Sequence, residues 1–260
     1  MIQAKGYVYS ENLQAWADRL SVDKQRTYEL MHLRPGDQVL DVGCGPGMDT
    51  LLLAQLVGPT GQVVGVDADA VMIAEANQRA AQAGVSAWCH HDQHDALALP
   101  FHTGAFTACR SERLFQHLVN PAAALVEMIR VTRPGGWVVV LDTDWGTRSI
   151  DTDEIDIERR LARFETEHMN HNGYAGRQLY RLFRRQQLVD VVLEMRPVHS
   201  TSYPFMRQGM QMEDCEAKAL AAGVVTAEEL QRWRRSLEHA DAEGVFFCSL
   251  LMTLVAGRKP

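Results

Sequence analysis

Short apolar runs alternate with amphipathic stretches through the first half of the chain. The apolar runs predict strands, because each is short and follows a turn signal such as Arg34-Pro35-Gly36-Asp37. The amphipathic stretches repeat apolar residues every three to four positions, which is typical of helices that pack on a sheet. The predicted strands are Gln38–Val42, Val63–Val66, Ser86–His94, Phe106–Cys109 and Trp137–Asp142, and the predicted helices are Thr50–Val57, Ala70–Ala83 and Ala122–Val131.

This alternation predicts a parallel sheet covered by helices on both faces, with the topology of a doubly wound nucleotide-binding fold. The first thirty or so residues are also expected to be helical. After Asp142 the rhythm breaks, and the remaining segments are expected to form a cap over the carboxyl edge of the sheet together with its last strands. Those segments are the predicted helices Asp153–Asn170, Gly176–Gln186 and most of Met206–Ala240, and the predicted strands Val189–Arg196 and Val245–Ala256.

Charge and composition narrow the class of protein. The 260 residues carry 26 Lys and Arg against 33 Asp and Glu, a formal charge of −7. That balance disfavours binding to nucleic acid or to an anionic membrane, which need a basic field. Five dispersed cysteines without a CxxC pair indicate a reducing compartment. No apolar run approaches the ~20 residues that span a bilayer, so we expect a cytoplasmic protein.

The strongest chemical signal is the stretch from Asp41 to Gly47, DVGCGPG. An acidic residue ends a buried strand, and glycines at alternate positions let the backbone approach a ligand closely. The helix that follows presents free N–H groups that suit a carboxylate or phosphate. Position 48 is Met, so the GxGxxG spacing of dinucleotide folds is absent, and no GK[ST] of a P-loop follows.

A second signal, Gly65-Val66-Asp67, stands about 20 residues further on. An acidic side chain at the end of the second strand can accept hydrogen bonds from both hydroxyls of a ribose. The alternative is an exposed Asp that caps the next helix.

Four segments in order, DVGCGPG, GVDADAVMIAEA, QHDALALPF and RVTRPGGWVVVLD, resemble the class I S-adenosylmethionine-dependent methyltransferases. The likeness is greatest to the small-molecule branch that includes the ubiquinone and menaquinone methylases, and it runs from Arg34 to about Asp142. It implies a Rossmann-like, doubly wound α/β fold with a mostly parallel seven-stranded sheet and helical cap insertions. It also implies one domain over 1–260, with a lid at 1–33, a cofactor-binding core at 34–142 and cap segments at 143–180 and 203–240.

The resemblance assigns the cofactor, S-adenosylmethionine, to a set of residues. The turn after the first strand would hold its methionine part, Asp67 its ribose, and residues further along its adenine. Arg110 departs from the family in size and charge, and it would meet either the cofactor carboxylate or an acidic substrate. The implied cofactor residues are Asp41, Gly43, Cys44, Gly45, Gly47, Asp67, Ala68, Met72, Asp95, Ala96 and Arg110.

Methyl transfer needs alignment and a dry pocket more than it needs a catalytic group. A base is required only if the acceptor must lose a proton. His117 is the candidate, because many relatives carry a His near the methyl donor and imidazole titrates near neutrality; the alternative is a structural His. Substrate candidates are Tyr9 in an N-terminal lid, Asp144 after the fifth strand and His171 after the first cap helix, each with a structural or solvated alternative.

The predicted function is methyl transfer to a small molecule by in-line displacement, and the competing hypothesis is a cofactor-binding regulatory or scaffold protein without that activity. Nucleic-acid or protein methylation is disfavoured because no Asn-Pro-Pro-Tyr-type tetrapeptide follows the fourth strand, where Arg110-Ser111-Glu112-Arg113 stands. No metal is expected, since His90, His91 and His94 lack partners at ligand spacing. The expected assembly is a monomer or homodimer.

Overall fold

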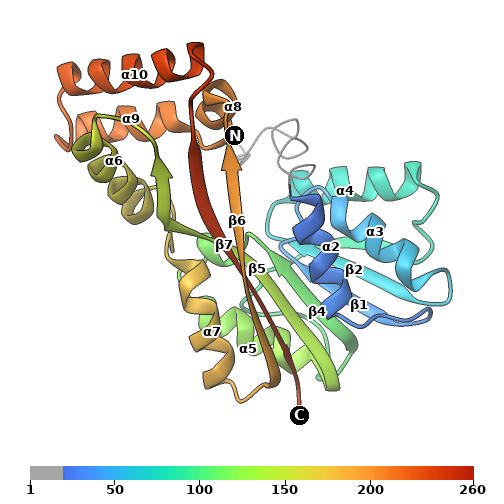
Figure 1. The fold of residues 1–260 in the computed structure, drawn as a ribbon. Helices are drawn as coiled ribbons and strands as arrows, with labels where there is room; N and C mark the ends of the chain where they lie inside the picture. Colours follow the sequence, from blue (N-terminus) through green and yellow to red (C-terminus); the bar gives the residue numbers. More distant parts are fainter. Residues whose placement is uncertain (1–19) are drawn as a thin grey trace.

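The computed structural model describes residues 20–260, and its strands form a single sheet (Figure 1). The strands run in the order β3-β2-β1-β4-β5-β7-β6. β1 to β5 pair in parallel, and β7 pairs antiparallel with both β5 and β6. Their bounds are β1 Gln38–Val42, β2 Gln62–Asp67, β3 Cys89–Gln93, β4 Phe106–Glu112, β5 Thr132–Ile150, β6 Val189–Ser200 and β7 Cys248–Arg258. The predicted doubly wound, mostly parallel seven-stranded sheet is confirmed.

Two apolar cores lie on the two faces of this sheet. One contains side chains from α2 (Ser21–Leu30), α3 (Met48–Val57) and α4 (Ala70–Gln82). The other contains side chains from α5 (Pro121–Val131) and α7 (Ala175–Arg185). Central strands buried on both faces explain the continuous apolar runs in the sequence.

The cap consists of α6 (Ile155–His168), α8 (Tyr203–Gly209), α9 (Met212–Ala221) and α10 (Ala227–Ala242), which gather at one end of the sheet (Figure 1). Its centre is the fully buried Trp233, which belongs to the same continuous core as Val39 and Leu141 of the sheet. None of the helices between residues 20 and 260 is long and apolar enough to cross a membrane.

The fifth strand is much longer than its sequence indicates. The sequence predicts a cap from residue 143, but β5 continues to Ile150, and Ile150 pairs with Cys248 of β7. The polar and glycine-containing stretch between Asp144 and Ser149 has no alternation of its own and passes through a register shift. Pairing with a strand a hundred residues away, and not local propensity, makes this segment extended.

Candidate functional site

The turn between β1 and α3 is the first part of the site. The N–H groups of Gly43 and Cys44 both donate to Val66 O, at 2.7 and 3.0 Å, which fixes the turn against the end of β2. Gly45 and Gly47 both have positive φ, 51° and 77°. A Cβ on Gly47 would lie 2.8 Å from Ala76 Cβ, whereas a Cβ on Gly45 would meet nothing within 4 Å in the part of the chain that the structure describes. The turn is therefore packed on one side and open at Gly45.

Asp67 ends β2 and faces this turn. Its Oδ2 accepts a hydrogen bond from Gly45 N at 2.9 Å, and its Oδ1 accepts one from Asp69 N at 3.0 Å. Asp69 in turn caps α4, because its carboxylate accepts from Val71 N. The strand-end carboxylate thus has a fixed orientation, and the capping role falls to Asp69, not to Asp67.

The other predicted cofactor residues lie at the same edge of the sheet. Ala68 follows β2 directly, and Met72 is half-buried on the first turns of α4. Asp95 and Ala96 follow β3; Asp95 is exposed and one of its oxygens accepts from Leu97 N, while Ala96 is buried. Parallel order places the carboxyl ends of β3, β2 and β1 side by side, so these residues and the glycine turn share one edge.

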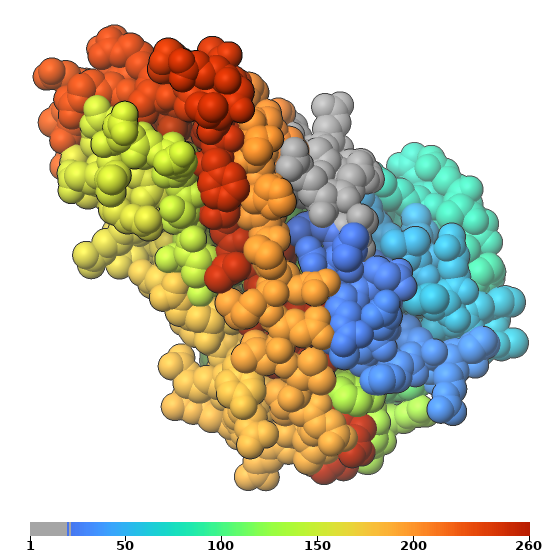
Figure 2. Space-filling model, in the orientation of Figure 1, coloured from blue at the N-terminus to red at the C-terminus, as the bar shows by residue number. Residues whose placement is uncertain are grey.

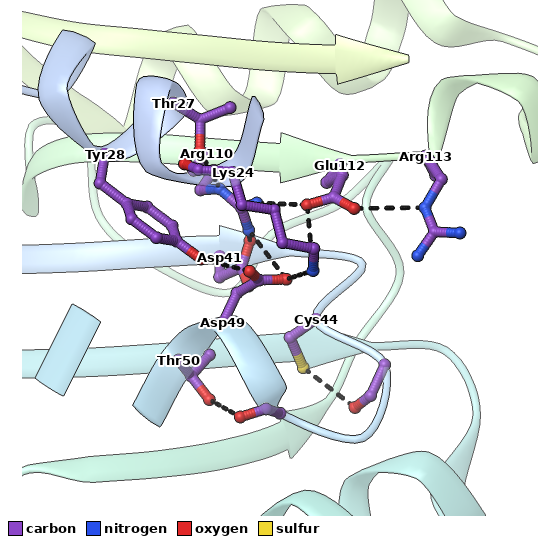
Figure 3. Close-up of polar contacts among 12 residues, drawn as sticks. Lys24, Thr27, Tyr28, Asp41, Cys44, Asp49, Thr50, Arg110, Glu112 and Arg113 are labelled. Carbon is purple, nitrogen blue, oxygen red and sulfur yellow. Dashed lines mark hydrogen bonds and ion pairs between the residues drawn. The ribbon is translucent and has the colours of Figure 1, made fainter. Parts of the chain in front are cut away.

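Arg110 departs from its predicted place. Its side chain is 1% exposed and lies in a cluster of buried carboxylates beneath the turn (Figure 3). Nη1 lies 3.2 Å from Asp41 Oδ1 and 3.5 Å from Asp49 Oδ2, and Nη2 lies 2.5 Å from Glu112 Oε2. Nε donates to Thr27 Oγ1 at 3.0 Å. The chain's own acids surround this guanidinium, as a buried cation requires paired anions.

Two of the three carboxylates around Arg110, Asp41 and Asp49, have pKa values shifted in opposite directions. Burial raises the pKa of Asp41 to about 7, although Arg110 acts to lower it. Burial acts in the same direction on Asp49, but there Arg110 and Lys24 together hold the pKa below its usual value. Asp49 is therefore the firmly ionised member, and it anchors both cations.

The sequence analysis missed most of this cluster. The missed residues are Lys24, Thr27, Tyr28, Asp49 and Glu112. One signal was available: Lys24 and Tyr28 stand four residues apart, so they share a face of a helix, and a lysine on a buried face needs a carboxylate. The residues near Lys24 in the sequence do not indicate which carboxylate that is.

His117 lies in a short 3-10 helix, Phe115–His117, just after β4. Asp142, in the middle of the neighbouring β5, holds this helix by accepting from Phe115 N at 2.6 Å. Burial, and then the positive charge of Arg113 and the neighbouring His171, lower the pKa of His117 to about 4. The imidazole is therefore neutral at pH 7.

The predicted substrate residues are placed unequally. His171 is exposed and lies close enough to His117 to affect its pKa. Asp144 is 3% exposed, and its Oδ2 accepts from Arg177 Nε of α7 at 2.6 Å. Tyr9 lies outside the described residues. Among residues 20–260, no three His, Cys, Asp or Glu side chains are grouped to hold a metal ion.

Comparisons with known proteins agree with one another. A methyltransferase domain family matches residues 33–187 of this chain. An uncharacterized 37.1 kDa protein in transposon TN4556 of Streptomyces fradiae is 32% identical over 255 residues, which cover 94% of this chain and 70% of that protein. The ubiquinone/menaquinone biosynthesis C-methyltransferase UbiE of Legionella pneumophila is 37% identical over 119 residues, 46% of this chain and 48% of that protein.

A solved structure with the same fold is the geranyl diphosphate C-methyltransferase from Streptomyces coelicolor, crystallised with Mg²⁺, geranyl diphosphate and S-adenosyl-L-homocysteine. The TM-score is 0.58 at 18% identity, and the match covers 92% of this chain and 78% of that one. The likeness lies in the fold.

Proposed function

This chain belongs to the class I S-adenosylmethionine-dependent methyltransferases, and from that premise we propose that it methylates a small-molecule acceptor. The site residues and their roles in that reaction are part of the proposal. We further propose that residues 20–260 act as one catalytic unit, since a single apolar core runs from the sheet into the cap.

The observation that carries the cofactor assignment is the open cradle at Gly45 beside Asp67. Among residues 20–260, no atom beyond the chain neighbours lies within 4 Å of the place of a Cβ on Gly45, while the backbone around it is fixed by hydrogen bonds to β2. A carboxylate held in a set orientation borders that space. An amino-acid-bearing nucleoside fits both features, with its amino-acid part along the turn and its ribose hydroxyls on Asp67.

The adenine side of the nucleoside falls to the residues after β2 and β3. Asp95 is exposed and has a second carboxylate oxygen to accept the amino group of the base, and the N–H of Ala96 is adjacent to it. The half-buried thioether of Met72 offers a polarizable surface to an aromatic ring, with Ala68 beside it.

Beneath the cofactor, Asp41 and Arg110 act as supports for the turn and not as direct ligands. Both side chains are almost fully buried. Cys44 is also buried, and its Sγ donates to Gly45 O at 3.6 Å. These groups hold the turn in the backbone conformation that the positive φ angles of Gly43 and Gly47 allow.

When bound, S-adenosylmethionine supplies a methyl group on a positively charged sulfur, which a nucleophilic acceptor atom displaces in line. We propose that His117 orients the acceptor by a hydrogen bond. With its pKa at about 4, its imidazole is a weak base, so orientation suits it better than proton abstraction. We also propose that His171 lies beside the acceptor, and that Asp144 contributes by holding Arg177 in place.

Isothermal titration calorimetry with S-adenosylhomocysteine tests the proposal directly. We expect micromolar binding with one site per chain, and no heat from NAD at the same concentration. Absence of S-adenosylhomocysteine binding at high micromolar concentration overturns the proposal, and NAD binding in its place points to a dehydrogenase cofactor. A screen of small-molecule acceptors, read by release of S-adenosylhomocysteine, then identifies the substrate.

A further inference from the structure

The helix α2 sends three polar side chains, Lys24, Thr27 and Tyr28, into the cluster beneath the glycine turn (Figure 3). Lys24 Nζ donates to Asp49 Oδ2 at 2.7 Å and lies 3.3 Å from Glu112 Oε2. One turn later on the same helix, the hydroxyl of Tyr28 donates to Asp49 Oδ1. Both oxygens of Asp49 are therefore held from α2, and Lys24 and Tyr28 are 5% and 4% exposed.

Asp49 occupies a position from which this contact reaches the turn. It lies in the first turn of α3, two residues after Gly47, which is the N-cap of that helix. Asp41 stands at the other end of the turn, two residues before Gly43. One nitrogen of Arg110, Nη1, lies within 3.5 Å of both carboxylates, so the cluster closes the glycine turn at its two ends.

The charges of the cluster make every partner necessary. Three carboxylates, Asp41, Asp49 and Glu112, face the two enclosed cations Lys24 and Arg110, while Arg113 reaches Glu112 Oε1 from the rim at 3.2 Å. Loss of one partner from a buried ion pair leaves an uncompensated charge, which the surrounding structure relieves by moving. A shift of Asp41 or Asp49 in response would reach the glycine turn directly, because these two carboxylates stand at its two ends and share Arg110 Nη1.

We propose that Lys24 and Tyr28 are positioning residues for the cofactor: through Asp49 they fix the glycine turn, so that docking of α2 and binding of S-adenosylmethionine stabilise each other. The inference rests on the proposed function, since it concerns the same site. The helix α2 lies outside the sequence motifs of the family. The coupling is reciprocal, so cofactor binding also stabilises the docking of α2.

The same helix supplies a matched control. Arg26, two residues after Lys24, binds Glu194 of β6 at 2.8 Å, and Asp23 binds Arg196 at 2.6 Å. Figure 2 shows α2 on the surface beside β6. Neither pair touches the turn, and the Asp23–Arg196 pair remains when Arg26 is replaced, so Arg26→Met leaves α2 docked and Asp49 held.

The test is calorimetric titration of S-adenosylhomocysteine into the full chain and three variants, with thermal unfolding as a record of stability. We expect Lys24→Met to raise Kd about tenfold, within the usual range of coupling between sites, and Tyr28→Phe, which keeps the apolar packing, to raise it about threefold. Arg26→Met should change Kd by less than twofold. Equal Kd values for wild type and both cluster variants overturn the inference, as does an equal rise in Arg26→Met.

Two further readouts separate positioning from general stability. In a double-mutant cycle with Asp49→Asn, Lys24→Met should add no further loss of affinity, because Lys24 acts through Asp49. Ligand binding should also slow amide hydrogen exchange across residues 22–30 in wild type but not in Lys24→Met; unchanged exchange in wild type contradicts the coupling. If wild type itself fails to bind S-adenosylhomocysteine, the proposed function fails, and the two failures are thereby distinguished.

Discussion

The backbone N–H of Gly45 donates a hydrogen bond to Asp67 Oδ2 across 2.9 Å and thereby joins the turn after β1 to the carboxylate that ends β2. Asp69 N holds the other carboxylate oxygen at 3.0 Å. A carboxylate already oriented in this way loses little rotamer freedom when a ligand binds, which favours affinity.

Replacement of Asp67 should therefore weaken cofactor binding more than it weakens the fold. We expect Asp67→Ala to raise the Kd for S-adenosylhomocysteine roughly thirtyfold or more, because charge-assisted hydrogen bonds are worth about 1.5–3 kcal/mol. Asp67→Asn, which keeps one acceptor oxygen, should have a Kd between those of wild type and Asp67→Ala. The measurement is calorimetric titration. The control is Asp69→Ala, which removes the cap of α4 and should cost about 1 kcal/mol of stability with little change in Kd; equal losses of affinity in both contradict the assignment.

Gly45 and Gly47 should respond differently to the same substitution. Gly47→Ala places a Cβ 2.8 Å from Ala76 Cβ and 3.0 Å from His91 Nε2 at a φ of 77°, so we expect a loss of about 2–4 kcal/mol of stability. Gly45→Ala meets no atom of residues 20–260 beyond its chain neighbours within 4 Å and should lose only about 1 kcal/mol. Its Cβ enters the proposed cofactor space, however, and binding should fall at least tenfold. Urea denaturation and titration check the pair; full affinity in Gly45→Ala would place the cofactor elsewhere.

His91 should make stability depend on pH. Burial lowers its pKa from 6.5 to about 4, and Thr50 Oγ1 lies 2.7 Å from its Nε2. Between these pH values the unfolded chain binds the proton and the folded chain does not, so stability rises with pH. The stability that the neutral, buried His91 contributes is fully present above about pH 6.5 and is lost as the pH falls to about 4. The corresponding change in unfolding free energy is about 3 kcal/mol.

The variant His91→Gln removes the pH-dependent stability that comes from His91. The difference in unfolding free energy between wild type and variant, measured by urea denaturation, should grow from pH 4 to pH 6.5 and then stay constant. A difference that does not vary with pH means that His91 titrates alike in both states.

His117 should remain neutral well below its ordinary titration range. We expect nuclear magnetic resonance of histidine-labelled protein to show its titration near pH 4, since burial and Arg113 both disfavour the imidazolium. Arg113→Gln removes the like charge and should raise the pKa of His117 part of the way towards 6.5, with burial still lowering it. An unchanged pKa in that variant would mean that Arg113 is too far away to act.

Local signals determined the cofactor half of this protein. The turn at the alternate glycines and the position of Asp67 at the end of a strand could be predicted from the sequence. Backbone conformation at a turn and the burial pattern of a strand depend on residues only a few positions apart. The same is true of α4, whose predicted and observed bounds, Ala70–Ala83 and Ala70–Gln82, differ by one residue. The family motifs lie in this half for the same reason.

Tertiary structure alone decided the rest. Arg110 was expected to meet a ligand and instead pairs with Asp41 and Asp49, while Lys24, far away in sequence, completes the cluster. β5 extends through a polar stretch because β7 pairs with it. Ion pairs and strand lengths are set by whichever distant groups the fold brings within a few ångströms. The local sequence therefore determined the glycine turn and α4, and only the folded chain determined the length of β5 and which charges meet beneath the turn.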